Sequence, residues 1–333
     1  MNKSSQTVVS RPGPFAAVVF NLILILLSPL LVVGYVLYIV KFLQAGSTGG
    51  GTAQAPLLGR WTQHNLGSRP DEPSRRLMEA LPGVSHLAMQ LLFVPMRLAV
   101  RASGYLPKSF RYPFEGEVSM QDEGFARQTF FDTVVERHLA DVAQFVILGA
   151  GFDTRALRLP PDARVRSFEV DTPKTQAAKR EALKLAGIDA ARVTLVAADF
   201  EKDDWLARLV DAGFDLGQPA LFVWEGVTMY LDRAAIETTL RKIASVAKGT
   251  VVAFDYYTTE VLESQAFMMR YARMGTKAAG SPLKFGIDST PPSRERLAEF
   301  LQACGLSLIE QRTLGPETAG KRAWGGFAVA TVK

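Results

Sequence analysis

Two glycines and an acid have the spacing of a nucleotide-binding site. Gly149 and Gly151 follow an apolar run, residues 145–148, that is typical of a buried strand, and their turn is predicted to open a helix. About 20 residues further on, Asp171 ends a second predicted strand, where its carboxylate can accept hydrogen bonds from ribose hydroxyls. The pattern predicts a cofactor site, although binders of nicotinamide, flavin and S-adenosylmethionine all use such a turn. A tight turn without a ligand is the alternative for the glycines taken alone.

The residue at position 154 distinguishes these cofactors. A dinucleotide-binding turn needs a third small residue there for close helix packing, whereas this chain has Thr154 after a charged Asp153. A branched side chain would crowd a pyrophosphate, and S-adenosylmethionine has none. The sequence therefore favours S-adenosylmethionine, and a nicotinamide cofactor is the alternative.

Strand and helix patterns alternate from residue 145 to the end of the chain. The predicted strands are residues 145–148, 164–170, 193–197, 220–224, 250–254, 306–313 and 327–332. The predicted helices between them are residues 174–186, 205–212, 233–246 and 293–303. Such alternation gives a mostly parallel sheet with helices on both faces. Only a loop joins the last two strands, so we expect them to pair antiparallel.

The N-terminal region contains a long apolar stretch without charge. Residues 16–40 have Asn21 and Ser28 as their polar interruptions and, at ~1.5 Å per helical residue, are long enough to cross a bilayer. They predict one transmembrane helix, kinked at Pro29. A cleaved signal peptide is the alternative, but its candidate cleavage triplet, residues 53–55, lies too far from the end of the apolar stretch.

Charge and cysteine content set the expected surroundings. Lys3 and Arg11 precede the apolar stretch, and more basic residues follow it, which places the C-terminal part in the cytoplasm by the positive-inside rule. The single cysteine, Cys304, cannot form an internal disulfide. The net charge of +5 is spread along the chain without a basic-aromatic block, so we expect no nucleic-acid partner and a domain that faces an anionic membrane leaflet.

The predicted organisation has four parts. They are an N-terminal tail (1–14), a transmembrane anchor (15–43), a flexible linker rich in small residues (44–69) and one α/β domain (70–333). The domain begins with a helical cap (70–140), and residues 256–292 form a second, capping insertion. Within the first cap, residues 84–105 predict an apolar helix broken at Pro95. Because this stretch carries Arg97 and Arg101, it is either a core helix or a lid over the site rather than a second span.

Six motifs in order carry a closer likeness. They are FARQTFFD (125–132), VILGAGFDTRALRL (146–159), SFEVDTP (167–173), VAADFEKDDW (196–205), FVWEGVTMYL (222–231) and SPLKFGID (281–288). Together they resemble the leucine carboxyl methyltransferase-like family, which implies a class I methyltransferase fold over roughly residues 70–333 and S-adenosyl-L-methionine as the cofactor. Gln128 stands where the family often has threonine, and soluble members lack the N-terminal stretch, so the resemblance does not fix the methyl acceptor.

The resemblance implies contacts to both ends of the cofactor. Arg127 matches the arginine that grips the cofactor carboxylate, for which a guanidinium fork is well shaped. Gly149, Ala150 and Gly151 would lie against the methionine part, and Asp171 would hold the ribose.

Residues after the third and fourth strands complete the implied site. Asp199 and Phe200 match a pair that bonds the adenine amine and packs on its ring, and Glu225 matches an acid near the cofactor amino group. Tyr230 and Arg155 are candidates for contact with the substrate, and Arg155 is alternatively a structural ion pair.

The expected methyl transfer requires few catalytic groups from the protein. A sulfonium methyl group needs an aligned nucleophile about 3 Å away, and a carboxylate nucleophile is already ionised at neutral pH. His64, His86 and His138 lie outside the strand-end motifs, in keeping with a reaction that needs no base, and we expect no metal. The predicted function is membrane-anchored O-methylation of a carboxylate on a small or hydrophobic acceptor. The alternatives are an NAD(P)-dependent oxidoreductase and a tethered binding protein with a degenerate pocket.

Overall fold

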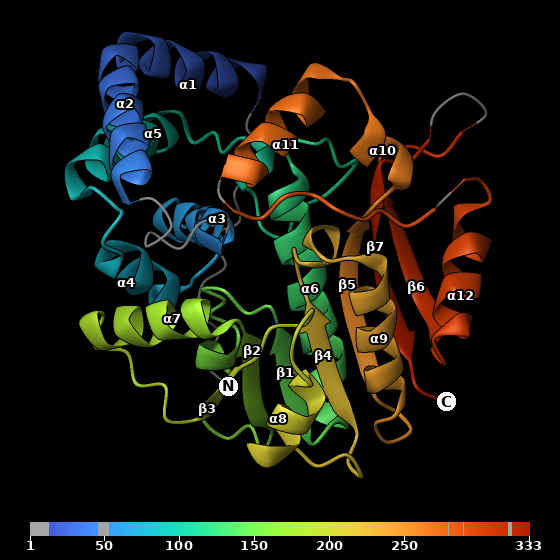
Figure 1. The fold of residues 1–333 in the computed structure, drawn as a ribbon. Coiled ribbons are helices and arrows are strands. Elements are labelled where there is room, and N and C mark those ends of the chain that lie inside the picture. The colour runs from blue at the N-terminus through green and yellow to red at the C-terminus, as the bar shows by residue number, and fades with distance from the viewer. Residues whose placement is uncertain (1–12, 46–52, 279, 289, 319–321) are drawn as a thin grey trace.

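The computed structural model describes residues 13–45, 53–278, 280–288, 290–318 and 322–333. Its centre is one sheet of seven strands in the order β3-β2-β1-β4-β5-β7-β6 (Figure 1). The strands are β1 (Gln144–Leu148), β2 (Arg166–Asp171), β3 (Val193–Ala197), β4 (Ala220–Trp224), β5 (Val251–Tyr257), β6 (Ser307–Leu314) and β7 (Gly325–Thr331). β1 to β5 are parallel, and β7 is antiparallel to both of its neighbours. This confirms the predicted class I methyltransferase sheet with an antiparallel pair at its end.

Helices cover both faces of the sheet. They are α6 (Glu123–His138), α7 (Pro173–Leu185), α8 (Trp205–Asp211), α9 (Arg233–Ala244) and α12 (Ser293–Ala303). Val146 and Leu148 pack in one core with α8, α9 and α12, whereas Phe145 and Ile147 pack in another with α6. Because alternate residues of a strand point to opposite faces, a central strand buried on both faces is apolar along its length, as β4 is throughout and β1 is after Gln144.

The apolar N-terminal stretch forms two helices, α1 (Pro14–Leu26) and α2 (Ser28–Ala45), which meet at a bend of 64°. The helix predicted over residues 16–40, with a kink at Pro29, is therefore two helices that join just before that proline, and its crossing of a membrane stays a prediction. Pro29 stands in the first turn of α2, where an N–H has no partner within the helix, so proline starts a new helix more readily than it continues one. No single helix in the described residues is long and apolar enough to cross a bilayer, although the bent pair together meets that test by length and composition.

Two predicted helix features differ from the structure. α5 (His86–Ser103) continues through the buried Pro95 instead of breaking there, and both α1 and α2 pack against it. After β1, the glycine turn opens no α-helix but a loop and one short 3₁₀-helix, η5 (Ala156–Arg158). The Asp153 carboxylate accepts the N–H of Arg155 at 2.7 Å, so a side chain satisfies a loop amide that a helix would otherwise bond.

The part of the chain expected as a linker contains helix α3 (Gln54–Asn65). Its buried Leu57 and Trp61 pack in a core shared with α4 (Glu72–Ala80) and α5. The tail residues 1–12 and residues 46–52 lie outside the described part. The predicted capping insertion holds α10 (Thr259–Glu263) and α11 (Phe267–Ala278), and α11 lies beyond the carboxyl end of the sheet in Figure 1.

Candidate functional site

A cavity of about 710 Å³ opens where the carboxyl ends of β1, β2 and β4 meet. The eight predicted cofactor contacts and Tyr230 all line it: Arg127, Gly149, Ala150, Gly151, Asp171, Asp199, Phe200, Glu225 and Tyr230. A larger groove of about 1000 Å³ beside α6 includes only Arg155 among the predicted site residues. We place the site in the smaller cavity, because ligands of parallel sheets bind beyond the carboxyl ends of the strands.

The glycine turn forms the floor of this cavity. Gly149 and Gly151 have φ angles of 65° and 49°, in the left-handed region that side chains disfavour. A Cβ atom at Gly149 would lie 2.3 Å from a methyl of Val227, and one at Gly151 would lie 3.0 Å from the Cβ of Ala53. Both positions therefore require glycine on conformational and steric grounds, and the beginning of α3 lies directly over the turn.

Asp171 joins the end of β2 to the glycine turn. Its Oδ2 accepts the N–H of Gly151 at 2.7 Å, and its Oδ1 accepts the N–H of Thr172 at 2.7 Å. Burial raises the pKa of this carboxyl group although both amides act in the opposite direction. Each carboxylate oxygen has a second acceptor site, so Asp171 can hold the turn, contact the Thr175 hydroxyl and still accept a hydrogen bond from a ligand hydroxyl.

Asp199 and Phe200 form the wall after β3. The Phe200 ring lies 6.0 Å from the ring of Trp205 and 6.2 Å from that of Trp224, so one side of it is fixed by aromatic packing. Partial burial opposes ionisation of Asp199, but the amide of Glu201 and the ammonium of Lys202 lower its pKa. This wall offers an anionic acceptor next to an aromatic face.

Arg127 projects from α6 into a cluster of acids. It pairs with Glu123 one turn away, and its Nε lies 3.0 Å from Oδ2 of Asp255 in β5. Tyr257 donates its hydroxyl hydrogen to Glu123 at 2.7 Å, and Nη1 of Arg127 lies against Gly226. Two of the three guanidinium nitrogens are thus held by acids, so the arginine has a fixed orientation at the cavity wall.

The two acids of this cluster were missed in the sequence. Burial raises the pKa of Asp255 to about 6, although Arg127 acts to lower it. The same arginine has a pKa held well above its usual value by Asp255 and Glu123, against the effect of burial. A signal was present for Asp255, because a single acid inside the otherwise apolar and aromatic strand β5 must find a partner.

Glu225 directly follows β4 and lies between the cavity and the protein interior. Its Oε2 accepts from Nη1 of Arg155 and from Nη2 of Arg60, the latter at 3.1 Å. Its Oε1 is buried and has no hydrogen-bond partner among the described residues. A buried carboxylate oxygen without a donor is costly unless a ligand supplies one.

Arg60 is a site residue that sequence reasoning missed. It lies on α3, lines the cavity, and pairs through Nη2 with Asp153 at 2.8 Å. The beginning of α3 adds Ala53, Ala55 and Pro56 to the same wall. Apolar residues at positions 57, 58 and 61 have helical spacing and could have identified this helix within the region taken for a linker.

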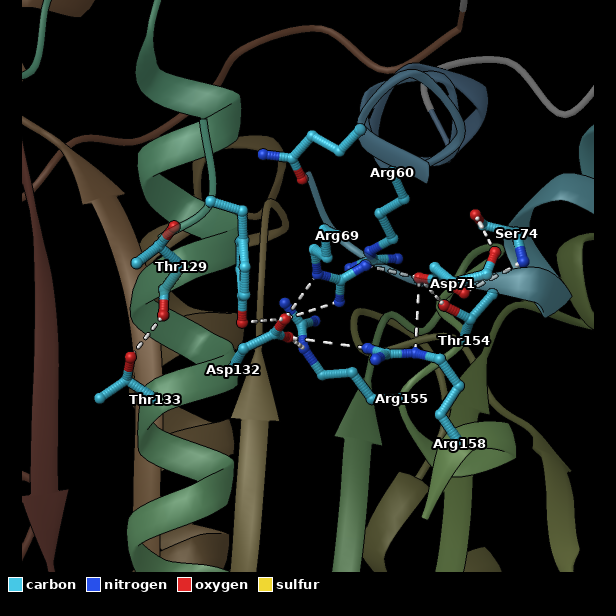
Figure 2. A network of polar contacts seen from close by, with 12 residues as sticks. Arg60, Arg69, Asp71, Ser74, Thr129, Asp132, Thr133, Thr154, Arg155 and Arg158 are labelled. Atoms are coloured by element: carbon cyan, nitrogen blue, oxygen red, sulfur yellow. Dashed lines mark hydrogen bonds and ion pairs between the residues drawn. The ribbon is translucent and has the colours of Figure 1, made fainter. Parts of the chain in front are cut away.

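Four arginines and four acids form one network that extends from the cavity wall into the protein interior. Its members are Arg60, Arg69, Arg155, Arg158, Asp71, Asp132, Asp153 and Glu225. Figure 2 shows the four arginines with two of the acids, Asp71 and Asp132. Arg155 contacts three of the acids, with distances of 2.7 Å to Asp132 and 2.5 Å to Asp153, and its side chain is 2% exposed. The structure thus places Arg155 outside the candidate cofactor cavity, where it joins α6, the loop after β1 and the end of β4.

The charges of the network stabilise one another. Burial opposes the ionisation of Asp132, yet Arg155 and Arg69 hold its pKa far below the usual range. Arg155 and Arg60 do the same for Asp153. Thr154, the residue that disfavoured a dinucleotide, is fully buried and donates its hydroxyl hydrogen to Asp71 at 2.8 Å.

The described residues contain no group of three or more His, Cys, Asp and Glu side chains arranged to hold a metal ion. Of the histidines, His64 accepts the N–H of Asp71 through Nδ1 at 2.9 Å, a contact that fixes the start of α4.

The cavity thus lies at the carboxyl edge of a class I methyltransferase sheet. Comparison with family models matches residues 107–244 to leucine carboxyl methyltransferase, and the chain belongs to this family. It is 35% identical over 204 residues, 56% of this chain and 67% of the relative, to a protein of Mycobacteroides abscessus named as a candidate S-adenosyl-L-methionine-dependent methyltransferase.

Other matches cover less of the relatives. A protein of the same name from Mycolicibacterium paratuberculosis is 36% identical over 186 residues, 54% of this chain and 60% of the relative. Another from Mycobacteroides abscessus is 42% identical over 130 residues, 43% of its length. The crystal structure of a DUF574 family protein from Streptomyces avermitilis aligns with 83% of this chain and 97% of its own, with 17% identity and a TM-score of 0.44.

Proposed function

We propose that the protein is an S-adenosyl-L-methionine-dependent methyltransferase that methylates a carboxylate on a small or hydrophobic acceptor. The family and the names of its relatives support the class of reaction. The observation that carries the proposal is the cavity at the strand ends. It brings together the glycine turn, the carboxylate of Asp171, the wall formed by Asp199 and Phe200, and the guanidinium group of Arg127. The orphaned Oε1 of Glu225 fits the cofactor, because an ammonium group would supply the donor that this oxygen lacks.

Each part of the cavity suits one part of the cofactor. Asp171 would accept from the ribose hydroxyls, Asp199 from the adenine amine, and Phe200 would pack on the adenine ring. Glu225 would accept from the amino group, and Arg127 would donate to the carboxylate. When bound, the cofactor supplies an electrophilic methyl group on a sulfonium.

The protein's own contribution is to position the acceptor and exclude water. No histidine lines the cavity within the described part of the chain, and a carboxylate acceptor needs no base because it is ionised at neutral pH. Burial raises the pKa of Tyr230, so its hydroxyl stays protonated and can donate a hydrogen bond to one acceptor oxygen. The other oxygen is then left for the reaction.

The geometry gives little support to the nicotinamide alternative. A dinucleotide pyrophosphate is bound at the N-terminus of a helix that follows the glycine turn, and this chain forms a loop and η5 there. The third small residue is replaced by Thr154, which the buried network uses.

Membrane attachment through the N-terminal region is part of the proposal. α1 and residues 28–40 of α2 contain no charged side chain, and the bent pair has the length and composition of a membrane segment. The excess of basic residues after the stretch favours a catalytic domain on the cytoplasmic side.

Differential melting of the full chain tests the proposal. We expect S-adenosylhomocysteine to raise the melting temperature and NADH to leave it unchanged, because only a ligand that binds the native state stabilises it. Stabilisation by NADH alone would favour the oxidoreductase, and no response to either ligand would favour a binding protein with a degenerate pocket. A screen of carboxylic acids with a labelled methyl donor, read as base-labile methyl esters, then tests the acceptor class.

A further inference from the structure

Exposed apolar side chains are concentrated on a few helices. Of the twenty large hydrophobic residues that the described part of the chain exposes, thirteen lie on α1, α2 and α5, and two more lie on α11. The most exposed include Phe15 at 79%, Leu26 at 77% and Met274 at 71%. Soluble proteins rarely gather exposed apolar residues in this way without a partner for the surface.

The same four helices share a charge pattern. None of α1, α2, α5 and α11 contains an aspartate or glutamate, although the chain has 33 acidic residues. Their charged residues are all basic: Lys41, Arg97, Arg101, Arg270, Arg273 and Lys277. Apolar surface combined with basic residues fits an anionic lipid interface. A second copy of the same surface would bring like charges together.

Neither α1 nor α2 alone is long enough to cross a membrane. At ~1.5 Å per residue, α1 is roughly 20 Å and α2 roughly 27 Å long, and each is shorter than the ~30 Å hydrocarbon core. They are bent by 64° and both pack on α5. In Figure 1, α1 and α11 lie at the same edge of the molecule, beyond the carboxyl ends of the parallel strands.

This edge is also where the cofactor cavity opens. Gly280 and Ser281, just after α11, line the cavity, and so do Ala53 and Ala55 at the beginning of α3, the helix that follows α2. The walls of the site are therefore continuous in the chain with the helices that expose apolar surface.

We infer that α1, α2, α5 and α11 dock in the interface of an anionic bilayer with the cavity facing the lipid, and that the acceptor is a membrane-resident amphiphile with a carboxylate headgroup. The inference of docking depends only on the exposed apolar and basic side chains. The inference about the acceptor also depends on the proposed function. α11 is a basic helix with exposed Tyr271 and Met274, so it lies in the headgroup region beside the mouth of the site.

Depth measurements on the full chain test the docking. A fluorophore is attached at Leu26→Cys, Met274→Cys or Leu216→Cys in a Cys304→Ser background and quenched by lipids labelled at different depths in phosphatidylglycerol-containing vesicles. We expect Leu26 and Met274 to lie at similar shallow depths of about 5–10 Å below the interface, as in interfacial helices. The control position Leu216, 40% exposed, should remain unquenched.

Three results would overturn the docking. Position 26 at the bilayer centre with position 274 in water would mean a spanning segment. Shielding of both positions without lipid, together with a dimer in solution, would mean that a second copy covers the surface. Equal quenching at position 216 would mean nonspecific adsorption.

A charge variant tests the contribution of α11. Arg270→Glu with Lys277→Glu should weaken binding to anionic vesicles about tenfold or more, since each basic residue near such a surface contributes roughly one tenfold step or slightly less. The matched control, Lys184→Glu with Lys248→Glu, changes the net charge equally on α7 and after α9 and should bind within about twofold of the parent. Equal losses in both pairs would show that net charge, not this surface, drives binding.

Vesicles that carry a long-chain fatty acid test the acceptor. With a labelled methyl donor, we expect methyl ester formation that the α11 charge pair slows on vesicles but not on a short water-soluble carboxylate. A protein that docks and binds S-adenosylhomocysteine by calorimetry, yet leaves the fatty acid unmethylated, would overturn the acceptor and leave the docking intact. Loss of S-adenosylhomocysteine binding would instead count against the proposed function.

Discussion

Glu225 belongs to two clusters of charged side chains, which differ in how completely their charges are paired. In the network behind it, Arg155, Arg60 and their partners face one another with four positive and four negative charges. In the cavity in front of it, Oε1 of Glu225 lacks a donor, and Asp171 keeps acceptor capacity beyond its two amide bonds. Since buried charges are tolerated when they are paired, the balanced cluster indicates structure and the incomplete one indicates a ligand.

The largest effect should follow from breaking the balanced cluster. Arg155→Met removes one of the arginines that pair with Asp132, Asp153 and Glu225. Arg69 and Arg60 remain beside these acids, but the buried network is left with one uncompensated negative charge, which costs roughly 3–5 kcal/mol in the free energy of unfolding. Urea unfolding of parent and variant in the same detergent measures the loss.

A matched control separates burial from charge. Arg75→Ala removes an arginine that also contacts two acids, Glu72 and Glu79, but at the surface of α4, where the loss should be about 0–1 kcal/mol. If the two variants lose equal stability, the buried network has no special structural role.

The free energy of unfolding should depend on pH in two opposite ways, because some buried acids have lowered pKa values and others have raised ones. Asp132 and Asp153 have pKa values lowered by their arginines, so the stability they add is complete above the unfolded value of ~3.9 and is lost as the pH falls below it. The contribution of Asp255 to stability changes with pH in the opposite direction. Its pKa is raised to about 6, so the folded state takes up a proton first, and stability rises as the pH falls from about 6 to 4.

Urea midpoints between pH 3 and pH 8 test this sequence of changes. We expect a maximum between pH 4 and pH 6. Asp255→Asn should reduce the rise on its alkaline side, to which Glu169 and Asp171 also contribute because burial raises their pKa values, while the loss below pH 4 remains. A curve for Asp255→Asn with the same rise as the parent would contradict the assignment of the raised pKa to Asp255.

In the incomplete cluster, we expect substitutions to affect ligand binding more than stability. Asp171→Ala removes the acceptor proposed for the ribose and should weaken S-adenosylhomocysteine binding by roughly 1.5–3 kcal/mol, more than tenfold in Kd by calorimetry. Asp171→Asn keeps an acceptor for the Gly151 amide, so it distinguishes loss of the ligand contact from collapse of the turn. The exposed Asp211→Ala is the control and should bind as the parent does. Unchanged binding in a folded Asp171→Ala protein would remove Asp171 from the site.

The sequence predicted the incomplete cluster better than the balanced one. Asp171, Asp199 and Glu225 each stand at or just after the end of a predicted strand. Because the carboxyl ends of parallel strands meet at one edge of the sheet, their convergence follows from local pattern and topology. Arg69 and Asp132 are 63 residues apart and Arg60 and Asp153 are 93 apart, and no periodicity relates such partners.

The prediction for the N-terminal apolar stretch differed from the structure for another reason. Hydropathy detects a long apolar stretch, but it does not detect that Pro29 begins a second helix or that α5 offers a surface for both halves. The result is a bent pair of helices packed on α5, where the sequence predicted one helix with a kink at Pro29. In the same way, packing against α4 and α5 makes α3 a helix in a region whose small residues had suggested a linker.

Arg127 sharpens the comparison because it has features of both clusters. Its Nε and Nη2 are held by Asp255 and Glu123, as in the balanced network, yet the residue lines the cavity. If it also holds the cofactor carboxylate, lysine should be a poor substitute, since an ammonium cannot contact two acids and a ligand in the same fixed plane. Arg127→Lys should then weaken S-adenosylhomocysteine binding by roughly 1–2 kcal/mol, one charged hydrogen bond. A decarboxylated cofactor analogue is the control and should bind parent and variant equally. If both ligands lose the same affinity, Arg127 acts only by shaping the cavity wall, and if neither does, it belongs with Arg155 among the structural arginines.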